Sequence, residues 1–250
     1  MRTANPVLGD KVFSGLRAQA VTADAMTLQG AVNKTMFLLL LLVIGAGLVW
    51  TQFFRSGHNV GVIAPWILIG VIGGLIAAVV TAFKPAWAPV SAPIYAALEG
   101  LAIGGISAIA EAQMPNVVLQ AVALTFGVLF SMLLAYKVGV VRATEKFKLG
   151  VVAATGAIAL VYIATMILGL FNVSIPYIHS NGLIGIGFSV FVVVIAALNL
   201  VLDFDFIEQG ARVGAPKYLE WYGAFALMVT LIWLYIEILR LLSKIAGRRN

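Results

Sequence analysis

The class of fold is decided by the stretch LIGIGFSVFVVVIAALNLVLDFDF, residues 183–206. It holds the roughly 20 mostly apolar residues that a helix needs to cross a bilayer. A transmembrane β-strand would instead alternate between apolar and polar residues over about 10 positions. The apolar character here does not alternate, so the stretch predicts a membrane-spanning helix.

Six further apolar runs of similar length occupy most of the remaining chain. They cover about residues 36–54, 62–83, 93–110, 117–136, 149–170 and 221–242. The breaks between the seven runs contain charges or helix breakers, and they fall at residues 55–57, 84–85, 113–116, 137–148, 172–181 and 208–220. We therefore expect an all-α integral membrane protein, a bundle of seven transmembrane helices.

The composition agrees with a membrane protein. Hydrophobic residues make up 62% of the 250 residues and charged residues 10%, against about 45–50% and 25% in soluble domains. The mean hydropathy is +1.05. The chain has no cysteine, which excludes a disulfide framework, a thiolate metal site and a cysteine nucleophile.

The basic residues predict the orientation of the bundle. Eleven of the 16 Lys and Arg residues lie in the N-terminal segment and in the breaks after the second, fourth and sixth runs. Lys and Arg favour cytoplasmic loops, so we expect a cytoplasmic N-terminus. The basic tail disagrees, because seven crossings place it outside; either the tail is tolerated there or the seventh run does not cross fully. We favour seven full crossings. The family resemblance given below implies that the membrane is a bacterial inner membrane. The net charge of +6 reflects this topology and attraction to anionic headgroups, and we expect no nucleic-acid partner.

Residues 1–35 precede the first apolar run. They lack the 7–15-residue apolar core of a signal peptide, and their apolar residues recur at rough helical spacing between scattered charges. One interpretation is a helix lying on the membrane surface; the other is a partly ordered cytosolic arm. We expect an amphipathic cytoplasmic arm over residues 1–35 and a transmembrane domain with a short basic tail over residues 36–250.

Glycine-rich segments predict close helix packing. GLAIGG at residues 100–105, GLIGIG at residues 182–187, and Gly70, Gly73 and Gly74 would let helix backbones approach one another. Such segments are common in membrane bundles and identify no function.

Four carboxylates within the predicted helices are candidates for pH sensing or an ion pathway: Glu99, Asp203, Asp205 and Glu237. Ionisable groups are costly in a membrane and usually face a cavity or a partner. Asn199 precedes Asp203 by four residues and shares its helical face. Asp205 is rotated from Asp203 by about 200°. We expect Asp203 to point into the bundle and Asp205 elsewhere; the alternative is that both are interfacial.

Glu237 lies in an apolar segment, three residues before Arg240. One interpretation is an ion pair between the two. The other is a carboxylate facing a polar path. Beside Asp203 it would share a proton and could transiently hold a hard cation such as calcium. The predicted helix ends place Glu237 roughly 20 Å from the level of Asp203, so direct contact would need a bent or re-entrant helix. Glu99 is an alternative partner for Asp203.

Enzyme motifs are missing from the sequence. No Walker A, Rossmann, zinc-protease or Gly-x-Ser-x-Gly motif occurs. His58 and His179 both fall in predicted loops, so neither an intramembrane serine protease nor a histidine-ligated haem or copper site is expected. We expect no enzymatic activity and no obligate cofactor.

Several segments resemble the Bax inhibitor-1 / YccA-like family, the transmembrane Bax-inhibitor-motif proteins, in its longer bacterial branch. The resemblance covers nearly the whole chain and is most specific in its last block. It rests on NPVLGDKVF (5–13), MTLQGAVNKTMFLLLLLV (26–43), YAALEGLAIGGIS (95–107), VRATEKFKLG (141–150) and LNLVLDFDFIEQGARVGAPKYLEWYGAFALMVTLIWLYIEILRLL (198–242).

The resemblance implies a seven-helix bundle with the last helix central, and a pH-sensitive calcium leak gated by acids in the sixth and seventh helices. Asp203 and Glu237 match those two acids. The chain departs from the family pattern by having Glu in the seventh helix where Asp is usual. This lengthens the side chain by one methylene group. The chain also separates the two acids by 34 residues, about ten more than the family pattern, and this separation puts a direct carboxylate pair in doubt.

Three functions remain open. The first is the cation leak, with calcium or protons as the ions. The second is a regulatory partner of a membrane complex, since some bacterial members of the family bind and restrain a membrane-bound AAA protease. The third, a secondary transporter, lacks the visible inverted repeat that would favour it.

Overall fold

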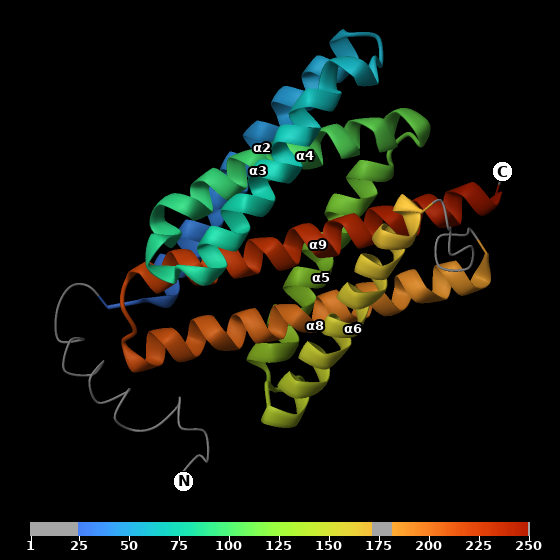
Figure 1. The fold of residues 1–250 in the computed structure, drawn as a ribbon. Helices are drawn as coiled ribbons and strands as arrows, with labels where there is room; N and C mark the ends of the chain where they lie inside the picture. The colour runs from blue at the N-terminus through green and yellow to red at the C-terminus, as the bar shows by residue number, and fades with distance from the viewer. Residues whose placement is uncertain (1–24, 172–181, 250) are drawn as a thin grey trace. The chain divides into compact units, whose positions relative to one another are not determined.

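The computed structural model describes residues 25–171 and 182–249, and Figure 1 draws them as a set of long helices. Over the described residues the backbone is helical apart from turns and one isolated β-bridge between Ala25 and Pro216. The elements are α2 (Leu28–Arg55), α3 (Val60–Phe83), the short 3₁₀ turn η2 (Pro85–Trp87), α4 (Ala88–Gln113), α5 (Val117–Lys137), α6 (Glu145–Leu170), α8 (Leu183–Val213) and α9 (Tyr218–Arg249).

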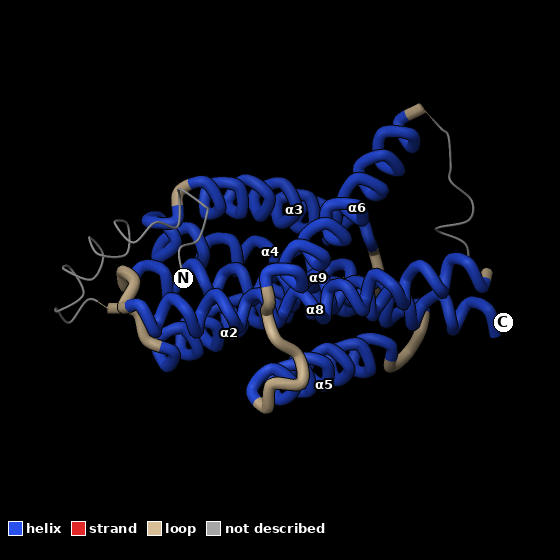
Figure 2. The backbone as a smooth tube through the Cα atoms, turned by 90° about the horizontal axis from the view of Figure 1, so that it is seen from below, coloured by secondary structure: helices blue, strands red, loops and turns tan. Residues whose placement is uncertain are grey.

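Seven of these helices are long and apolar enough to cross a membrane, which confirms the predicted all-α membrane fold. Short loops join the helices within the described parts of the chain (Figure 2). Two predictions concern residues outside the described ones. They are the amphipathic arm, most of which is residues 1–24, and the break over residues 172–181.

Several helix ends differ from the sequence prediction by a few residues, and two of them have a clear local cause. Helix α2 begins at Leu28, eight residues before the predicted start of the first run, because the Thr27 hydroxyl caps it by accepting a hydrogen bond from Gly30 N. Helix α8 continues to Val213, well past residue 206. It stops where Gly214 takes a positive φ of 66°, the backbone conformation that most often ends helices. The break predicted over residues 208–220 is therefore only a four-residue turn.

The helices form two compact units, which are described separately. Of the described residues, unit 1 contains 25–109 and 205–228, and unit 2 contains 110–171, 182–204 and 229–249. Helices α4, α8 and α9 each contribute residues to both units.

In unit 1, α2, α3 and the first part of α4 lie side by side (Figure 1). The backbone of α4 at Gly100 and Gly104 lies against the α2 backbone at Leu42 and Ala46, with no room for a Cβ atom. The predicted glycine-rich segment at residues 100–105 is thus the surface on which α2 and α4 approach most closely. An apolar cluster of Val49, Phe53, Ile63 and Ala108 fills the space at one end of these helices.

In unit 2, the core joins α6, α8 and α9. Ile158, Val192 and Ile195 form a buried cluster, and Tyr162 and Trp233 pack against it. Because Tyr162 also carries a hydroxyl, this apolar cluster borders the polar groups described below.

Burial differs sharply among the helices. In the most apolar part of α9, 61% of the residues are buried, against 11–22% in α2, α3, α5 and α6. Many large apolar side chains of those four helices are exposed, as expected for surfaces whose solvent is lipid. By this measure the last helix is the most buried of the seven described helices.

Candidate functional site

Polar side chains line the seam between α8 and α9 in unit 2, where the two helices run antiparallel. At one point of the seam Lys244 Nζ donates to Ser189 Oγ at 2.9 Å and to Gly185 O at 3.0 Å. At another, the Thr230 side chain hydrogen-bonds the Asp203 carboxylate. Ser189 and Asp203 lie 14 residues apart on α8, and Thr230 and Lys244 lie 14 residues apart on α9. The two helices therefore keep one register along the seam.

Asp203 is the carboxylate of this seam that lacks a counter-charge. Its Oδ2 is shielded from solvent and has no hydrogen-bond partner among the described residues, and no Lys or Arg of those residues forms an ion pair with it. Thr230, which hydrogen-bonds the same carboxylate, is itself buried. An unsatisfied buried carboxylate oxygen is costly, and it marks Asp203 as a position where a proton or a cation would be stabilised.

Asn199 extends the polar face of α8 by one turn. Its Nδ2 donates to Thr155 Oγ1 of α6 at 2.8 Å and to Ile195 O at 2.8 Å. Because Asn199 and Asp203 lie four residues apart, the amide and the carboxylate share one face of α8.

Glu237 has the opposite environment to Asp203. Its side chain is 1% exposed. Arg240 Nη1 donates to Oε1 at 2.9 Å and to Oε2 at 3.1 Å, and the Tyr162 hydroxyl donates to Oε1 at 2.8 Å. Arg240 Nη1 also lies 2.7 Å from the Tyr162 hydroxyl oxygen. The negative charge of Glu237 is therefore matched within the protein.

Asp203 and Glu237 lie on the same seam but do not form a pair. The contact partner of Asp203 is Thr230, seven residues before Glu237, and seven residues correspond to a rise of about 10 Å. The offset is half of the roughly 20 Å expected from the sequence, because α8 continues ten residues beyond Asp203. No hydrogen bond joins the two carboxylates in the described part of the chain.

The other two candidate carboxylates belong to unit 1. Asp205 is on the exposed side of α8, where its Oδ2 accepts a hydrogen bond from Gln209 Nε2 at 2.6 Å. Glu99 is half-buried on α4 beside Gly74 of α3. Neither contributes to the α8–α9 seam of unit 2.

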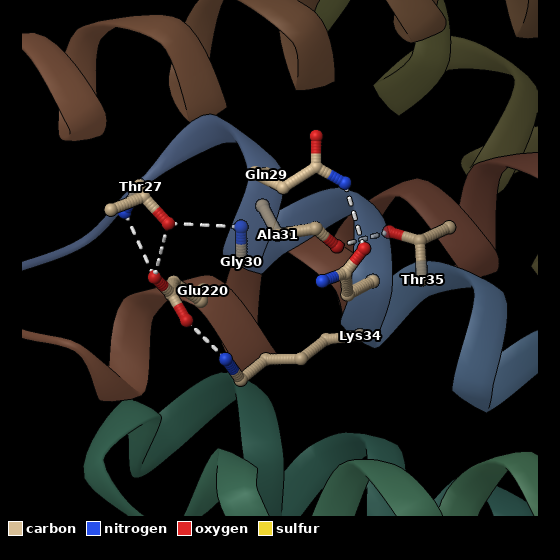
Figure 3. A network of polar contacts seen from close by, with 8 residues as sticks. Thr27, Gln29, Gly30, Ala31, Lys34, Thr35 and Glu220 are labelled. Atoms are coloured by element: carbon tan, nitrogen blue, oxygen red, sulfur yellow. Dashed lines mark hydrogen bonds and ion pairs between the residues drawn. The ribbon is translucent and has the colours of Figure 1, made fainter.

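A second polar cluster in unit 1 was not found from the sequence (Figure 3). The buried Glu220 accepts hydrogen bonds from Thr27 N at 2.8 Å and from Thr27 Oγ1 at 3.0 Å, and it forms an ion pair with Lys34. A hydrogen bond of 2.7 Å from Met26 N to Ala215 O adds to this junction. The cluster fixes the start of α2 to the start of α9; Glu220 was missed because the sequence places it in a loop.

No metal site is evident from the described side chains. They contain no group of three or more His, Asp or Glu residues that could hold an ion. Asp203 and Glu237 each bring one carboxylate to different levels of the seam, so together they do not supply the 6–8 oxygen ligands of a calcium site.

These features define an integral membrane protein of seven long helices, with a buried, uncompensated carboxylate in the seam between its last two helices. A family model described as Bax inhibitor 1 like matches residues 5–247. The chain belongs to this family, and the match confirms the resemblance. The family is not a known family of enzymes. Comparisons with curated proteins and with solved structures gave no match.

Proposed function

We propose that this protein is a pH-sensitive cation leak, with calcium as the permeant ion and Asp203 as the carboxylate that the ion meets. The observation that carries the proposal is the shielded Oδ2 of Asp203, which has no partner among the described residues. A free carboxylate oxygen within a membrane-spanning helix attracts a cation and can also bind a proton.

The pH sensitivity follows from that single group. Protonation of Asp203 removes the negative charge that a passing cation would meet, so the same oxygen serves the ion and senses the proton. Asn199 and Thr155 continue the polar face by one turn along α8 and α6, which supports a polar path on this face rather than an isolated charge.

In this proposal the role of Glu237 differs from that of Asp203. Because Arg240 and Tyr162 occupy its carboxylate, a cation reaches Glu237 only if these contacts open. We infer that the Glu237–Arg240–Tyr162 cluster closes the path next to Asp203, and that ion passage requires Arg240 to move from the carboxylate. We place the N-terminus in the cytoplasm, as the basic residues predict, and the protein in a bacterial inner membrane, as the resemblance to the bacterial branch of the family implies.

The test is calcium entry into proteoliposomes that contain the full chain, followed with an enclosed calcium dye. The pH is stepped from mildly alkaline to mildly acidic. Wild type is expected to show a flux that changes with pH, and Asp203→Asn a flux that no longer does. Asp205→Asn is the matched control, because Asp205 lies two residues away on the exposed side of the helix.

Two outcomes would contradict the proposal. The first is an unchanged pH response in Asp203→Asn, which would remove Asp203 from the path. The second is a wild-type flux no greater than that of empty liposomes at any pH, which would leave regulation of a membrane-bound protease complex as the function to test.

A further inference from the structure

Glu99 is a second membrane carboxylate that the proposed leak does not use. It lies near the middle of α4, eleven residues from the start at Ala88 and fourteen from the end at Gln113. Its carboxylate lies over Gly74 of α3, where an added Cβ atom would be 2.6 Å from Glu99 Oε2. The glycine therefore leaves the space that the carboxylate occupies between the two helices.

The surroundings of Glu99 supply no counter-charge. No described residue donates a hydrogen bond to its carboxylate or forms an ion pair with it. Helix α3 has no ionisable residue, and the α2 surface that meets α4 here is formed by Leu42, Gly45 and Ala46. An ionisable group on the same helix is Tyr95, one turn earlier on α4, whose ring is buried against Phe225.

The helices that pack against Glu99 hold few charged groups, and the basic residue inside α2 already has a partner. Lys34, the basic residue inside α2 before its last turn, is bound to Glu220. Arg55 and Lys84 lie at the distant ends of α2 and α3. A carboxylate in this position needs a cation from outside the described side chains, since an unpaired charge at the depth of the bilayer is costly.

The number of oxygen ligands decides which cation fits. Calcium takes 6–8 oxygen ligands and magnesium needs near-octahedral coordination. Glu99 offers one carboxylate, and no group of three or more His, Asp or Glu residues occurs among the described residues. A proton needs a single oxygen atom, so it is the cation that this site can hold with the ligands present.

We propose that Glu99 is an intramembrane proton-binding site, formed by α3 and α4 of unit 1 and separate from the Asp203 seam of unit 2. The observations that carry it are the mid-helix position, the space that Gly74 leaves for the carboxylate and the lack of a described partner. The proposal does not rest on the cation leak, because it concerns the protonation of Glu99 and not the passage of an ion.

A lipid-soluble carbodiimide tests this directly on the full chain in detergent, with no ion flux to measure. The protonated carboxyl group adds across a C=N bond of the reagent, its proton goes to nitrogen, and the adduct rearranges to a stable N-acylurea without a leaving group. Mass mapping of peptides then locates the adduct. We expect an adduct on Glu99 in wild type, with a yield that falls as the pH is raised, and loss of this adduct in Glu99→Gln.

Glu111, on the same helix, is the internal control. Its carboxylate accepts hydrogen bonds from Asn116 N at 2.6 Å and Val118 N at 3.1 Å, so both of its oxygen atoms are engaged by the backbone and are less accessible to the reagent. We expect little adduct there. The absence of an adduct on wild-type Glu99, a yield independent of pH, or an equal yield on Glu111 would overturn the proposal.

Three further variants locate the site. Gly74→Ala places a Cβ against Glu99 Oε2 and is expected to slow labelling, whereas Gly47→Ala, which has open space around it, is expected to label as wild type does. Asp203→Asn is expected to keep the Glu99 adduct. Loss of the adduct in Asp203→Asn would show that the two carboxylates do not act separately, and an unchanged rate in Gly74→Ala would contradict the placement of the carboxylate over α3.

Discussion

Arg240 and Glu237 form a two-point contact, in which one guanidinium nitrogen donates to both carboxylate oxygens at 2.9 and 3.1 Å. The side chain of Glu237 is 1% exposed and that of Arg240 36%, so the arginine is the member of the pair that can move toward solvent. Asp203, on the same seam, has no such partner. The two acids of the seam thus differ in charge balance although the sequence makes them look alike.

The first prediction concerns this pair. Arg240→Gln leaves the charge of Glu237 buried with only Tyr162 as a donor, and removing one member of a buried ion pair costs about 3–5 kcal/mol. We expect the free energy of unfolding to fall by about this amount, measured by reversible denaturant titration in mixed micelles with circular dichroism. The double variant Arg240→Gln/Glu237→Gln removes the unpaired charge and is expected to recover most of the loss.

The matched control is Arg248→Gln, an exposed residue two turns further along α9. Its replacement is expected to change the free energy of unfolding by less than about 0.5 kcal/mol. If Arg240→Gln were no more destabilised than Arg248→Gln, the pair would not stabilise the fold, and the part given to Glu237 in the leak would be wrong.

The sequence predicted the seven helices because each apolar run has about the length that a helix needs to cross a bilayer, a property that does not depend on tertiary contacts. The helix ends were predicted less well. Signals for them were present: Thr27 is a good N-cap residue, and Gly214 followed by Pro216 ends a helix and prevents its continuation. Charged residues such as Glu208 predict a loop, but Glu208 pairs with Arg212 on the exposed side of α8.

The candidate site was only partly predictable for a different reason. The Glu237–Arg240 contact is local, and its spacing of three residues indicates it. The contact of Tyr162 with Glu237 joins residues 75 positions apart, and the sequence contains no signal for it. The same holds for Thr27 and Glu220, which are 193 positions apart. Only the arrangement of the helices shows which carboxylate is neutralised and which is not.

The second prediction concerns the Lys34–Glu220 ion pair of unit 1. The side chain of Glu220 is 1% exposed and that of Lys34 18%. Both charges are poorly hydrated, so each is stabilised mainly by the other. In a double-mutant cycle of Lys34→Met and Glu220→Gln, we expect each single change to destabilise the fold. The double variant is expected to lose less than the sum, with a coupling energy of about 1–3 kcal/mol.

A second ion pair serves as the reference for that cycle. Glu208 and Arg212 lie 2.9 Å apart, but the arginine is 74% exposed. Exposed pairs at this helical spacing contribute about 0.2–0.5 kcal/mol. Equal coupling energies in the two cycles would show that burial does not strengthen the Lys34–Glu220 contact, and that this junction is not what fixes the start of α2.

The third prediction concerns the close approach of α2 and α4. A Cβ atom at Gly104 would lie 2.5 Å from Ala46 Cα, so Gly104→Ala forces two helix backbones apart. Overpacking of this kind costs about 1–3 kcal/mol, although alanine favours a helix over glycine by up to about 1 kcal/mol. The backbone contact outweighs the propensity, and we expect net destabilisation in the same denaturant titration.

Gly47→Ala separates the two effects, because nothing lies within 4 Å of its added Cβ. It gains the helix propensity without the clash, and its free energy of unfolding is expected to equal or exceed that of wild type. A Gly104→Ala variant as stable as Gly47→Ala would mean that α2 and α4 can separate freely. In that case the glycine-rich segment at residues 100–105 would not set the distance between these helices.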